Sequence, residues 1–326
     1  MAQPKLTLAL SHYDRHVPLL LDGSLDSDRP ELQVLLVGQS SPLKHGQDRH
    51  ERMLQKGEFD ICELSLSSYL IAKSRSMPFT AIPVFPRRLF SQSQMWVNAN
   101  ARINSPRDLI GKKVGLSTFQ TTMSVLAKGD LQSEYDVPWR EIEWYMSKDE
   151  AVPIKPIEGV EMHLLSPGQK IGAMLEKGEI DALIVPHPPK EALRGGGNIR
   201  RLFGDPKAEE ARYFRKNGFY PIMHVVAFKD EVLTKNPWLA TSVTEAFDRA
   251  KQSCVEYYDD PNWSRFVWGR HLFEEERAVF GEDPWPHGIK KNRANLERFI
   301  GYSLDQGLIE RKLEVEELFA ESSLGS

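Results

Sequence analysis

The sequence predicts an α/β protein of two lobes, each a mixed sheet flanked by helices, with a ligand cleft between the lobes. Its 326 residues exceed the size of one ordinary domain. Short β-branched runs alternate with helical patterns, as in parallel βαβ units. The segment 53–61, MLQKGEFDI, is echoed at 174–182 as MLEKGEIDA, which suggests two halves built on one plan.

The composition is that of a globular protein. Hydrophobic residues make up 40% and charged residues 27% of the chain, and the net charge is −4 with acids and bases interspersed. The longest apolar runs, LTLAL and LQVLLV, have the length of strands and are far too short to span a membrane. We therefore expect no nucleic-acid or membrane partner, and any attraction for an anionic ligand must be local.

The first half of the chain predicts alternating strands and helices. A helix ending at about Lys56 is followed by Gly57, which can adopt the left-handed conformation that closes helices. Ser65 can cap the helix that follows the third strand. The three strands are expected at Leu6–Leu10, Leu32–Val37 and Phe59–Leu64.

The second half of the chain contains a similar connection, in which a helix ends at a glycine and a strand follows. Ser105 is placed to cap a short helix, Pro106 takes its first position, and Gly111 ends it. A strand at Lys112–Leu116 and a helix opening near Gln120 are then expected.

The C-terminal part predicts amphipathic helices that pack back on the first lobe. Two β-rich segments carry the chain between the lobes, so lobe one comprises residues 1–94 and 226–326, and lobe two residues 95–225. This plan resembles the type II periplasmic-binding fold, in which ligands sit at the carboxyl ends of strands. The helices are expected at Trp238–Tyr258, Asn292–Leu308 and Val315–Ala320, and the crossings at Gln94–Asn98 and Ile222–Phe228.

The N-terminal sequence MAQPKLTLAL enters a strand pattern without a leader-like region, so we expect a cytoplasmic protein. Cys62 and Cys254 are expected to be buried thiols, since no CxxC or Cys/His cluster is present. No cofactor is predicted, although His and Glu side chains brought together by folding are an alternative set of ligands for a divalent metal. The long C-terminal helices offer a surface for a homo-oligomer.

In lobe one, the residues just after the strands are the candidates for the cleft. Arg15 could hold a carboxylate, or could instead pair with Asp14. Glu63 leaves the third strand in a half-buried position, where its pKa could be raised so that it donates a proton; an ordinary buried hydrogen bond is the alternative. Ser65 and Ser67 follow at a helix N-terminus.

The remaining candidates follow later strands. Adjacent arginines in an extended segment point to opposite sides, and we favour Arg88 over Arg87 as the cleft residue. His187 follows a strand at Ala182–Val185, and His224 lies at the return crossing. A helix start with hydroxyl groups and no acid predicts a site for an anion; its candidate residues are Ser117, Thr118, Gln120 and Thr121.

Several segments, taken together and in this order, resemble the 4,5-dihydroxyphthalate decarboxylase family over nearly the whole chain. The joint SPRDLIGKKVG (105–115) is typical of the wider binding-protein superfamily, whereas the other segments are more specific. Those segments are YDR (13–15), FDICELSLSSYL (59–70), IPVFPRR (82–88), FYPIMH (219–224), and DPWPHG (283–288) followed by NR (292–293).

This resemblance implies a carboxy-lyase of aromatic-acid breakdown that removes one carboxylate of a catechol dicarboxylate as CO2, giving protocatechuate. The site must bind the second carboxylate, take a phenol proton and deliver a proton to the ring carbon. The helix-start residues with Arg15 or Arg88 would serve the first task. His187 or His224 would be the base and Glu63 the acid, with Tyr220 of FYPIMH a further substrate contact.

Three other functions compete with this one. A non-catalytic binding protein for a small aromatic carboxylate would share the fold, as would an enzyme of the futalosine menaquinone route or a ligand sensor. Relatives carry His where Gln92 stands and Arg where His187 stands, so a different aromatic acid is a further alternative. The ExSxSSY, IPVFP and DPWP elements favour the decarboxylase.

Overall fold

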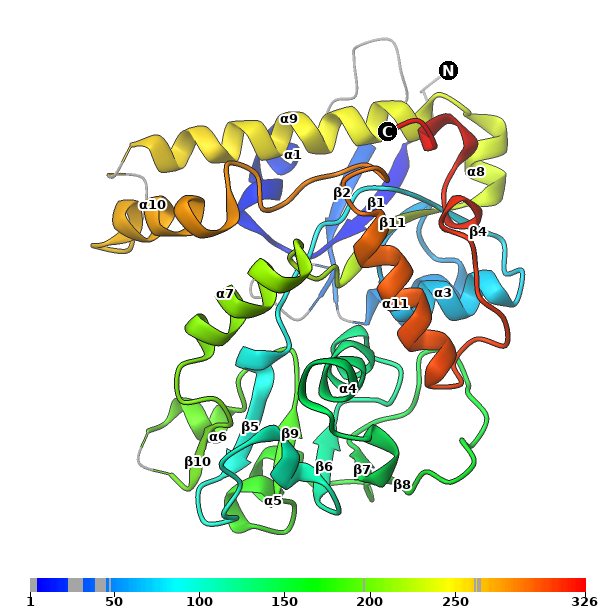
Figure 1. Ribbon diagram of the computed structural model, residues 1–326. Helices are drawn as coiled ribbons and strands as arrows, with labels where there is room; N and C mark the ends of the chain where they lie inside the picture. Colours follow the sequence, from blue (N-terminus) through cyan, green and yellow to red (C-terminus); the bar gives the residue numbers. More distant parts are fainter. Residues whose placement is uncertain are drawn as a thin grey trace. The chain divides into compact units, whose positions relative to one another are not determined.

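The computed structural model describes residues 5–22, 32–38, 45–46, 48–195, 197–260, 262 and 265–326. The chain divides into two compact units (Figure 1). Unit 1 comprises Met1–Arg87, His224–Glu297 and Leu313–Ser326, and unit 2 comprises Arg88–Met223 and Arg298–Lys312. The predicted division placed everything after residue 226 in lobe one, whereas 298–312 belong to unit 2.

Unit 1 contains a five-stranded sheet of order β2-β1-β3-β11-β4. The first three strands are parallel, and β11 runs antiparallel between β3 and β4. β3 is buried along its whole length, as expected of a strand covered on both faces. The strands are β1 (Leu6–Leu10), β2 (Leu32–Leu36), β3 (Ile61–Ser65), β4 (Phe79–Ile82) and β11 (His224–Lys229).

The long helix α9 (Leu239–Asp259) provides much of the core of unit 1 and runs across this sheet in Figure 1. Its buried residues recur at helical spacing, among them Leu239, Val243 and Phe247, and they pack with Leu8, Ile61 and other strand residues. The other helical segments of unit 1 are η1 (Asp14–His16), α1 (Val17–Asp22), α2 (Arg49–Lys56), α3 (Leu66–Ser74), α8 (Asp230–Lys235), α10 (Gly269–Phe280), η5 (Val315–Leu318) and η6 (Glu321–Ser323).

Unit 2 contains a six-stranded mixed sheet of order β10-β5-β9-β6-β7-β8. In it β5 is antiparallel to both of its neighbours, and the remaining pairs are parallel. The strands are β5 (Met95–Asn98), β6 (Lys113–Leu116), β7 (Glu143–Met146), β8 (Met162–Leu164), β9 (Ala182–Ile184) and β10 (Ile199–Arg201). Two sheets of mixed direction, each with helices, confirm the predicted α/β class.

In unit 2 the helix α4 (Thr122–Tyr135) follows β6 and is buried over most of its length. The helix α11 (Arg293–Asp305) begins in unit 1 and continues in unit 2. The other helical segments of unit 2 are η2 (Gln92–Gln94), η3 (Pro106–Leu109), η4 (Trp139–Glu141), α5 (Ile171–Lys177), α6 (Lys190–Leu193) and α7 (Pro206–Asn217).

The predicted helix ends match the structure where they depend on local signals. Gly57 is left-handed, with φ of 57°, and the Ser65 hydroxyl accepts the backbone N–H of Ser68. Ser105 and Asp108 form a capping box, although the segment they begin is a 3-10 turn. Cys62 and Cys254 are buried free thiols.

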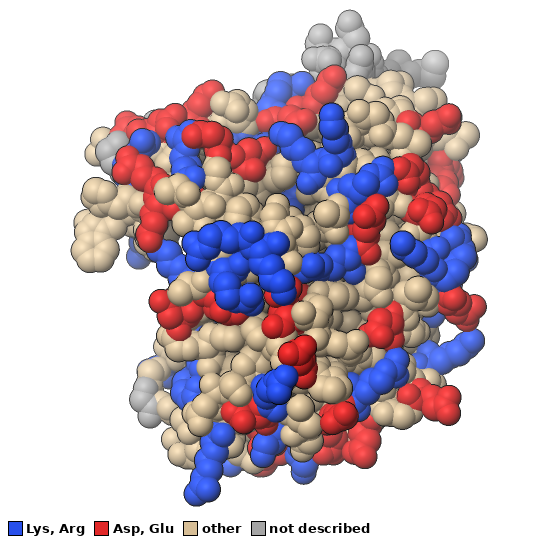
Figure 2. All heavy atoms as spheres, viewed as in Figure 1, with Lys and Arg blue, Asp and Glu red and all other residues tan. Residues whose placement is uncertain are grey.

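The surface agrees with the weak net charge. In Figure 2 acidic and basic side chains are interspersed over the visible face. Among the described helices, none combines the length and the apolar character needed to cross a membrane.

Candidate functional site

The carboxyl end of β3 in unit 1 holds a buried carboxylate surrounded by hydrogen-bond donors. Glu63 is fully buried. It accepts the backbone N–H of Ser11 at 2.8 Å and the hydroxyl of Tyr13 at 3.0 Å. Arg49 Nη2 lies 2.9 Å from Glu63 Oε1, and Nδ1 of His224 makes a short contact with the same oxygen. All four partners are polar groups that can donate.

The sheet topology brings these groups together. β1 and β3 are parallel neighbours, so the loop after β1 delivers Ser11 and Tyr13 to the end of β3. β11 is antiparallel to β3, and its first residue, His224, pairs with Ser65. The start of α2 supplies Arg49. The site therefore depends on segments that are far apart in the sequence.

Arg49 is buried and links several parts of the site. Its Nε donates to the backbone carbonyl of Glu63 at 2.9 Å, and its Nη1 donates to that of Val37 at 3.1 Å. Gly38 follows directly, and a Cβ atom there would lie 2.7 Å from Ser11 Oγ and 2.9 Å from Arg49 Nη1. Glycine is required at this position because the guanidinium approaches the backbone closely.

The electrostatics correct one prediction. Burial alone would raise the pKa of Glu63, but the Arg49 guanidinium and the His224 contact outweigh it, so this pKa lies well below its usual range. A protonated Glu63 would also point its proton at groups that themselves donate. The predicted raised pKa is therefore wrong, and Glu63 is a carboxylate rather than a proton donor. Burial and the charge of Glu63 raise the pKa of Tyr13, which stays a phenol.

Two histidines adjoin this carboxylate. Burial lowers the pKa of His224 to about 4, although the charge of Glu63 opposes the shift. His50, at the start of α2, accepts the backbone N–H of Ser65 on Nδ1 at 3.1 Å. Burial and the nearby charge of Arg49 hold the pKa of His50 well below its usual value. Both rings are therefore neutral at pH 7.

Arg15 has a different environment from the one predicted. Its guanidinium lies between the rings of Tyr13, at 4.4 Å, and Trp285, at 3.9 Å. Its Nε donates to the backbone carbonyl of Pro86 at 3.0 Å, and Nη1 lies 3.4 Å from Asp14. Arg15 thus connects the loop after β1 with the DPWPHG and IPVFPRR segments, and the guanidinium is already engaged.

The two arginines after β4 lie in different units. Arg88, which we favoured, is buried in unit 2 and donates from Nη1 to the backbone carbonyl of Tyr220 at 2.7 Å. Arg87 is half-buried in unit 1, and its positive charge acts on Tyr13, His50 and His224. The charge of Arg87, rather than that of Arg88, therefore acts on the groups around the Glu63 carboxylate.

The predicted helix-start site in unit 2 is filled by the chain itself. The Glu150 carboxylate accepts the backbone N–H groups of Phe119 at 2.6 Å and Gln120 at 3.1 Å. The hydroxyls of Thr118 and Thr121 lie 2.7 Å apart and bond each other. In this structure the helix-start N–H groups are therefore bonded by Glu150, a partner that the sequence could not identify.

The other predicted residues have clear local positions. Ser65 caps α3, and Ser67 is fully buried in the first turn of that helix. In unit 2, Ser117 is half-buried after β6, and His187 is exposed after β9. Tyr220 is half-buried and stacks on Phe90, with ring centroids 4.6 Å apart.

Arg49 and His50 are the residues that the sequence interpretation missed. A signal for them does exist. Arg49 precedes the buried Met53 by four residues, and His50 precedes the buried Leu54 by the same spacing. Four-residue spacing puts each pair on one face of α2, so two polar groups on the apolar face of a helix indicate partners in the core.

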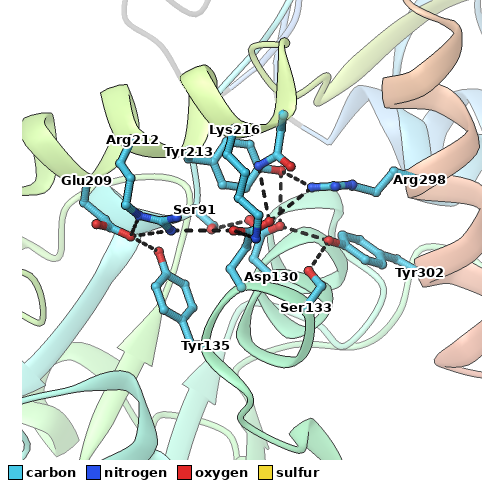
Figure 3. Close-up of polar contacts among 12 residues, drawn as sticks. Ser91, Asp130, Ser133, Tyr135, Glu209, Arg212, Tyr213, Lys216, Arg298 and Tyr302 are labelled. Atoms are coloured by element: carbon cyan, nitrogen blue, oxygen red, sulfur yellow. Dashed lines mark hydrogen bonds and ion pairs between the residues drawn. The ribbon is translucent and has the colours of Figure 1, made fainter.

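Unit 2 contains a second buried carboxyl, shown in Figure 3. Asp130 on α4 accepts from the hydroxyls of Ser91 at 2.6 Å, Tyr302 at 3.2 Å and Tyr213 at 3.3 Å. Burial is the main reason that its pKa is raised to about 7, and the charge of nearby Glu134 adds to the shift.

One group within the described residues has the composition of a metal site. Glu143, Glu161 and His163 lie on or beside the edge strand β8 and its neighbour β7 in unit 2, with their donor atoms within 4.8 Å of one another. In unit 1 both Glu63 oxygens already face donors, so they are poorly placed to bind a cation.

Comparisons with known proteins agree with this architecture. The chain is 31% identical to a protein of Comamonas testosteroni named 4,5-dihydroxyphthalate decarboxylase, over 100% of this chain and 99% of that protein. A protein of Pseudomonas putida with the same name is 28% identical over 66% of this chain and 83% of its own length. No protein-family model matches the chain.

Solved structures agree in fold alone. The periplasmic aliphatic sulphonate binding protein SsuA from Escherichia coli matches with a TM-score of 0.57 at 13% identity, over 99% of both chains. The alkanesulfonate-binding protein SsuA from Xanthomonas axonopodis pv. citri gives a TM-score of 0.58, also at 13% identity, over 98% of this chain and 99% of its own.

Proposed function

Since the chain belongs to the family of 4,5-dihydroxyphthalate decarboxylases, we propose that it converts 4,5-dihydroxyphthalate to protocatechuate and CO2 without a cofactor. The full-length relationship carries this proposal. The Glu63–His224 pair in unit 1 supports it, because a buried carboxylate that orients a neutral histidine is a common way to build a general base.

His224 is the proposed base. The Glu63 carboxylate can only accept, so Nδ1 of His224 carries the proton that faces it. The lone pair is then on Nε2, where it can take the proton of a phenolic hydroxyl. The resulting imidazolium would be stabilised by Glu63, which is the role of the acid in a carboxylate–histidine pair.

The electron flow follows from the substrate. The hydroxyl para to the departing carboxylate gives its proton to His224, and the phenolate electrons raise the density at the carbon bearing that carboxylate. Water gives the proton that forms the new C–H bond there and is left as hydroxide. The C–C bond to the carboxylate then breaks, CO2 leaves, and its electron pair restores the aromatic phenolate, which takes back the proton from His224.

Arg87 is the proposed partner for a substrate carboxylate. It takes the place that the sequence interpretation gave to Arg15 and Arg88. Arg15 is held by Pro86 and two aromatic rings, and Arg88 by the carbonyl of Tyr220. Arg87 is half-buried, and its charge already acts on Tyr13 and both histidines.

The test is incubation of the purified protein with 4,5-dihydroxyphthalate, with and without a chelator, while CO2 release and protocatechuate are followed. Release that is unchanged by the chelator is expected. Tight binding without release would instead favour the non-catalytic binding protein, and loss of activity on chelation would overturn the cofactor-free reaction. We also propose a cytoplasmic location, which cell fractionation would check.

A further inference from the structure

Two histidine rings lie side by side in unit 1 and are attached to the same strand. The ring centroids of His50 and His224 are 5.1 Å apart, with an angle of 70° between the planes. Each ring uses Nδ1 to contact β3. His50 bonds the backbone N–H of Ser65, and His224 contacts the carboxylate of Glu63. Their partners differ in kind, which determines where each ring carries its proton.

His50 carries its proton on Nε2. A backbone N–H can only donate, so Nδ1 of His50 must offer a lone pair to Ser65. The ring is neutral at pH 7, because burial and the charge of Arg49 hold its pKa well below the usual value. A neutral imidazole with a lone pair on Nδ1 has its proton on Nε2.

His224 has the opposite tautomer. The Glu63 carboxylate is an acceptor, so the proton lies on Nδ1. Arg49 Nη2 is a competing donor at 3.3 Å, but it is farther from Nδ1 than the carboxylate oxygen is. With the pKa of His224 near 4, the ring is neutral and Nε2 keeps a lone pair.

The outer nitrogens of both rings are available. Across the residues that the structure describes, neither Nε2 has a hydrogen-bond partner in the protein. Neither belongs to the unpaired atoms that are sealed from solvent. The two neighbouring rings therefore offer one donor, on His50, and one acceptor, on His224.

One donor and one acceptor on neighbouring rings are the groups that the edge of a catechol requires. Its two hydroxyl oxygens are a hydrogen-bond length apart, and in the proposed reaction one must give up a proton while the other remains a hydroxyl. We propose, on the basis of the function above, that His50 is a specificity residue. Its Nε2–H donates to the hydroxyl oxygen next to the one whose proton passes to Nε2 of His224.

The roles are chemically balanced. The only proton that moves between these groups is the one from the para hydroxyl to His224, and His50 keeps its own proton throughout. A neutral imidazole N–H is a poor acid but a good hydrogen-bond donor to an oxygen that gains negative charge. A substrate without the second hydroxyl would leave this N–H unpaired and would be bound less well.

Two variants separate this role from a structural one. His50→Asn keeps a side-chain oxygen that can accept the Ser65 N–H but removes the outer donor. His50→Gln instead extends an amide N–H toward the outer position. Turnover of 4,5-dihydroxyphthalate and of 4-hydroxyphthalate, which lacks the second hydroxyl, would be measured for the wild type and for both variants.

The wild type is expected to prefer the dihydroxy substrate. In His50→Asn the ratio of the two kcat/KM values should fall about tenfold, the loss of about one hydrogen bond, because kcat/KM for 4,5-dihydroxyphthalate falls more than that for 4-hydroxyphthalate. In His50→Gln the ratio should lie between those of His50→Asn and the wild type, because the amide N–H replaces part of the lost donor. Equal losses on both substrates, or no change in the ratio, would overturn the proposal.

Binding separates this inference from the proposed function. Calorimetric affinities for protocatechuate and 4-hydroxybenzoate need no catalysis, and the same preference should be present in the wild type and lost in His50→Asn. If this occurs without CO2 release, only the decarboxylase function fails. Nitrogen-15 spectra of the imidazole rings should show protonated Nε2 in His50 and protonated Nδ1 in His224; identical tautomers would contradict the donor–acceptor pair.

Discussion

Two buried carboxyls, Glu63 in unit 1 and Asp130 in unit 2, are equally hidden from solvent yet have opposite pKa shifts. Glu63 faces a guanidinium, a backbone amide and a histidine. Among the described residues, the hydrogen bonds that Asp130 accepts come from hydroxyls, and the charge of another acid, Glu134, raises its pKa further. Burial favours the neutral form of both, and the partners decide whether that preference prevails.

The cations near Asp130 pair elsewhere. Lys216 lies 2.8 Å from Glu134, and Arg298 lies 3.4 Å from it. Glu134 thus has directly paired cations, whereas the direct partners of Asp130 are neutral hydroxyls and the charge of Arg298 lowers its pKa only in part. In this chain, the buried acid with a directly bonded guanidinium has a lowered pKa, and the buried acid bonded by hydroxyls has a raised one. Variants that change the partners of each carboxyl should therefore have different effects.

The largest effect is expected from Arg49→Met. Removing the guanidinium leaves Glu63 buried without its cation, which costs about 3–5 kcal/mol of unfolding free energy, and turnover should be lost. Urea unfolding followed by circular dichroism would measure the loss. Arg52→Met is the matched control, since Arg52 is on the same helix but pairs with the more exposed Glu58; equal destabilisation by both variants would contradict the special role of Arg49.

Glu63→Gln should lower kcat by about 10²–10⁴-fold, the range of general acid–base contributions. The amide cannot accept from all four donors or stabilise an imidazolium on His224. Initial rates with 4,5-dihydroxyphthalate would test this, with Glu58→Gln as the control. Turnover at the wild-type level in Glu63→Gln would remove Glu63 from the mechanism.

Asp130→Asn should change the pH dependence of stability without abolishing turnover. The native pKa of Asp130, about 7, exceeds the usual unfolded value of about 3.9. Between these two pH values the folded chain keeps a proton on Asp130 that the unfolded chain has lost. The free energy of unfolding of the wild type therefore falls as the pH rises through this range. Relative to that of the wild type, the free energy of unfolding of the variant should rise by about 1.4 kcal/mol per pH unit over this range.

Urea midpoints at several pH values would measure this trend, and the gain should level off above about pH 7. The contribution of Glu63 to stability should depend on pH in the opposite direction. Its lowered pKa means that its stabilising contribution is present above the unfolded pKa, about 4.3, and is lost as pH falls toward the native value. Parallel pH profiles for Asp130→Asn and Glu63→Gln would contradict the comparison.

The smallest effect is expected from Glu150→Ala, which removes a third carboxylate that is held by backbone donors. Since it bonds the N–H groups of Phe119 and Gln120, its loss should cost about 1 kcal/mol, as for a helix cap. Thermal unfolding would measure the change, with Asp149→Ala as the neighbouring control. A stability equal to the wild type would show that these N–H groups are satisfied without Glu150.

The sequence was most informative where the determining interactions are local. Strand β1 has the predicted bounds, and Gly57 and Ser65 end and begin helices as expected, because a cap depends on residues a few positions away. Glu63 and His224 were both predicted, and the structure brings them into contact.

What escaped prediction depends on distant partners. The pKa of Glu63 was assigned the wrong direction because Arg49, 14 residues earlier at the start of α2, bonds its carboxylate, a contact that the spacing alone did not show. Glu150 is about 30 residues from the N–H groups that it binds. Arg88 was favoured as the cleft residue and Arg87 as the solvated one, whereas Arg88 is buried in unit 2 and Arg87 is half-buried in unit 1.

The position of β11 has a consequence for folding during synthesis. This strand pairs with both β3 and β4 in the five-stranded sheet, yet it begins at residue 224. As the chain leaves the ribosome, the first four strands of unit 1 must wait for all of Arg88–Met223 to be made before their sheet is closed. His224 is the first residue of that strand, so the nascent chain acquires its proposed base at the moment its sheet can close.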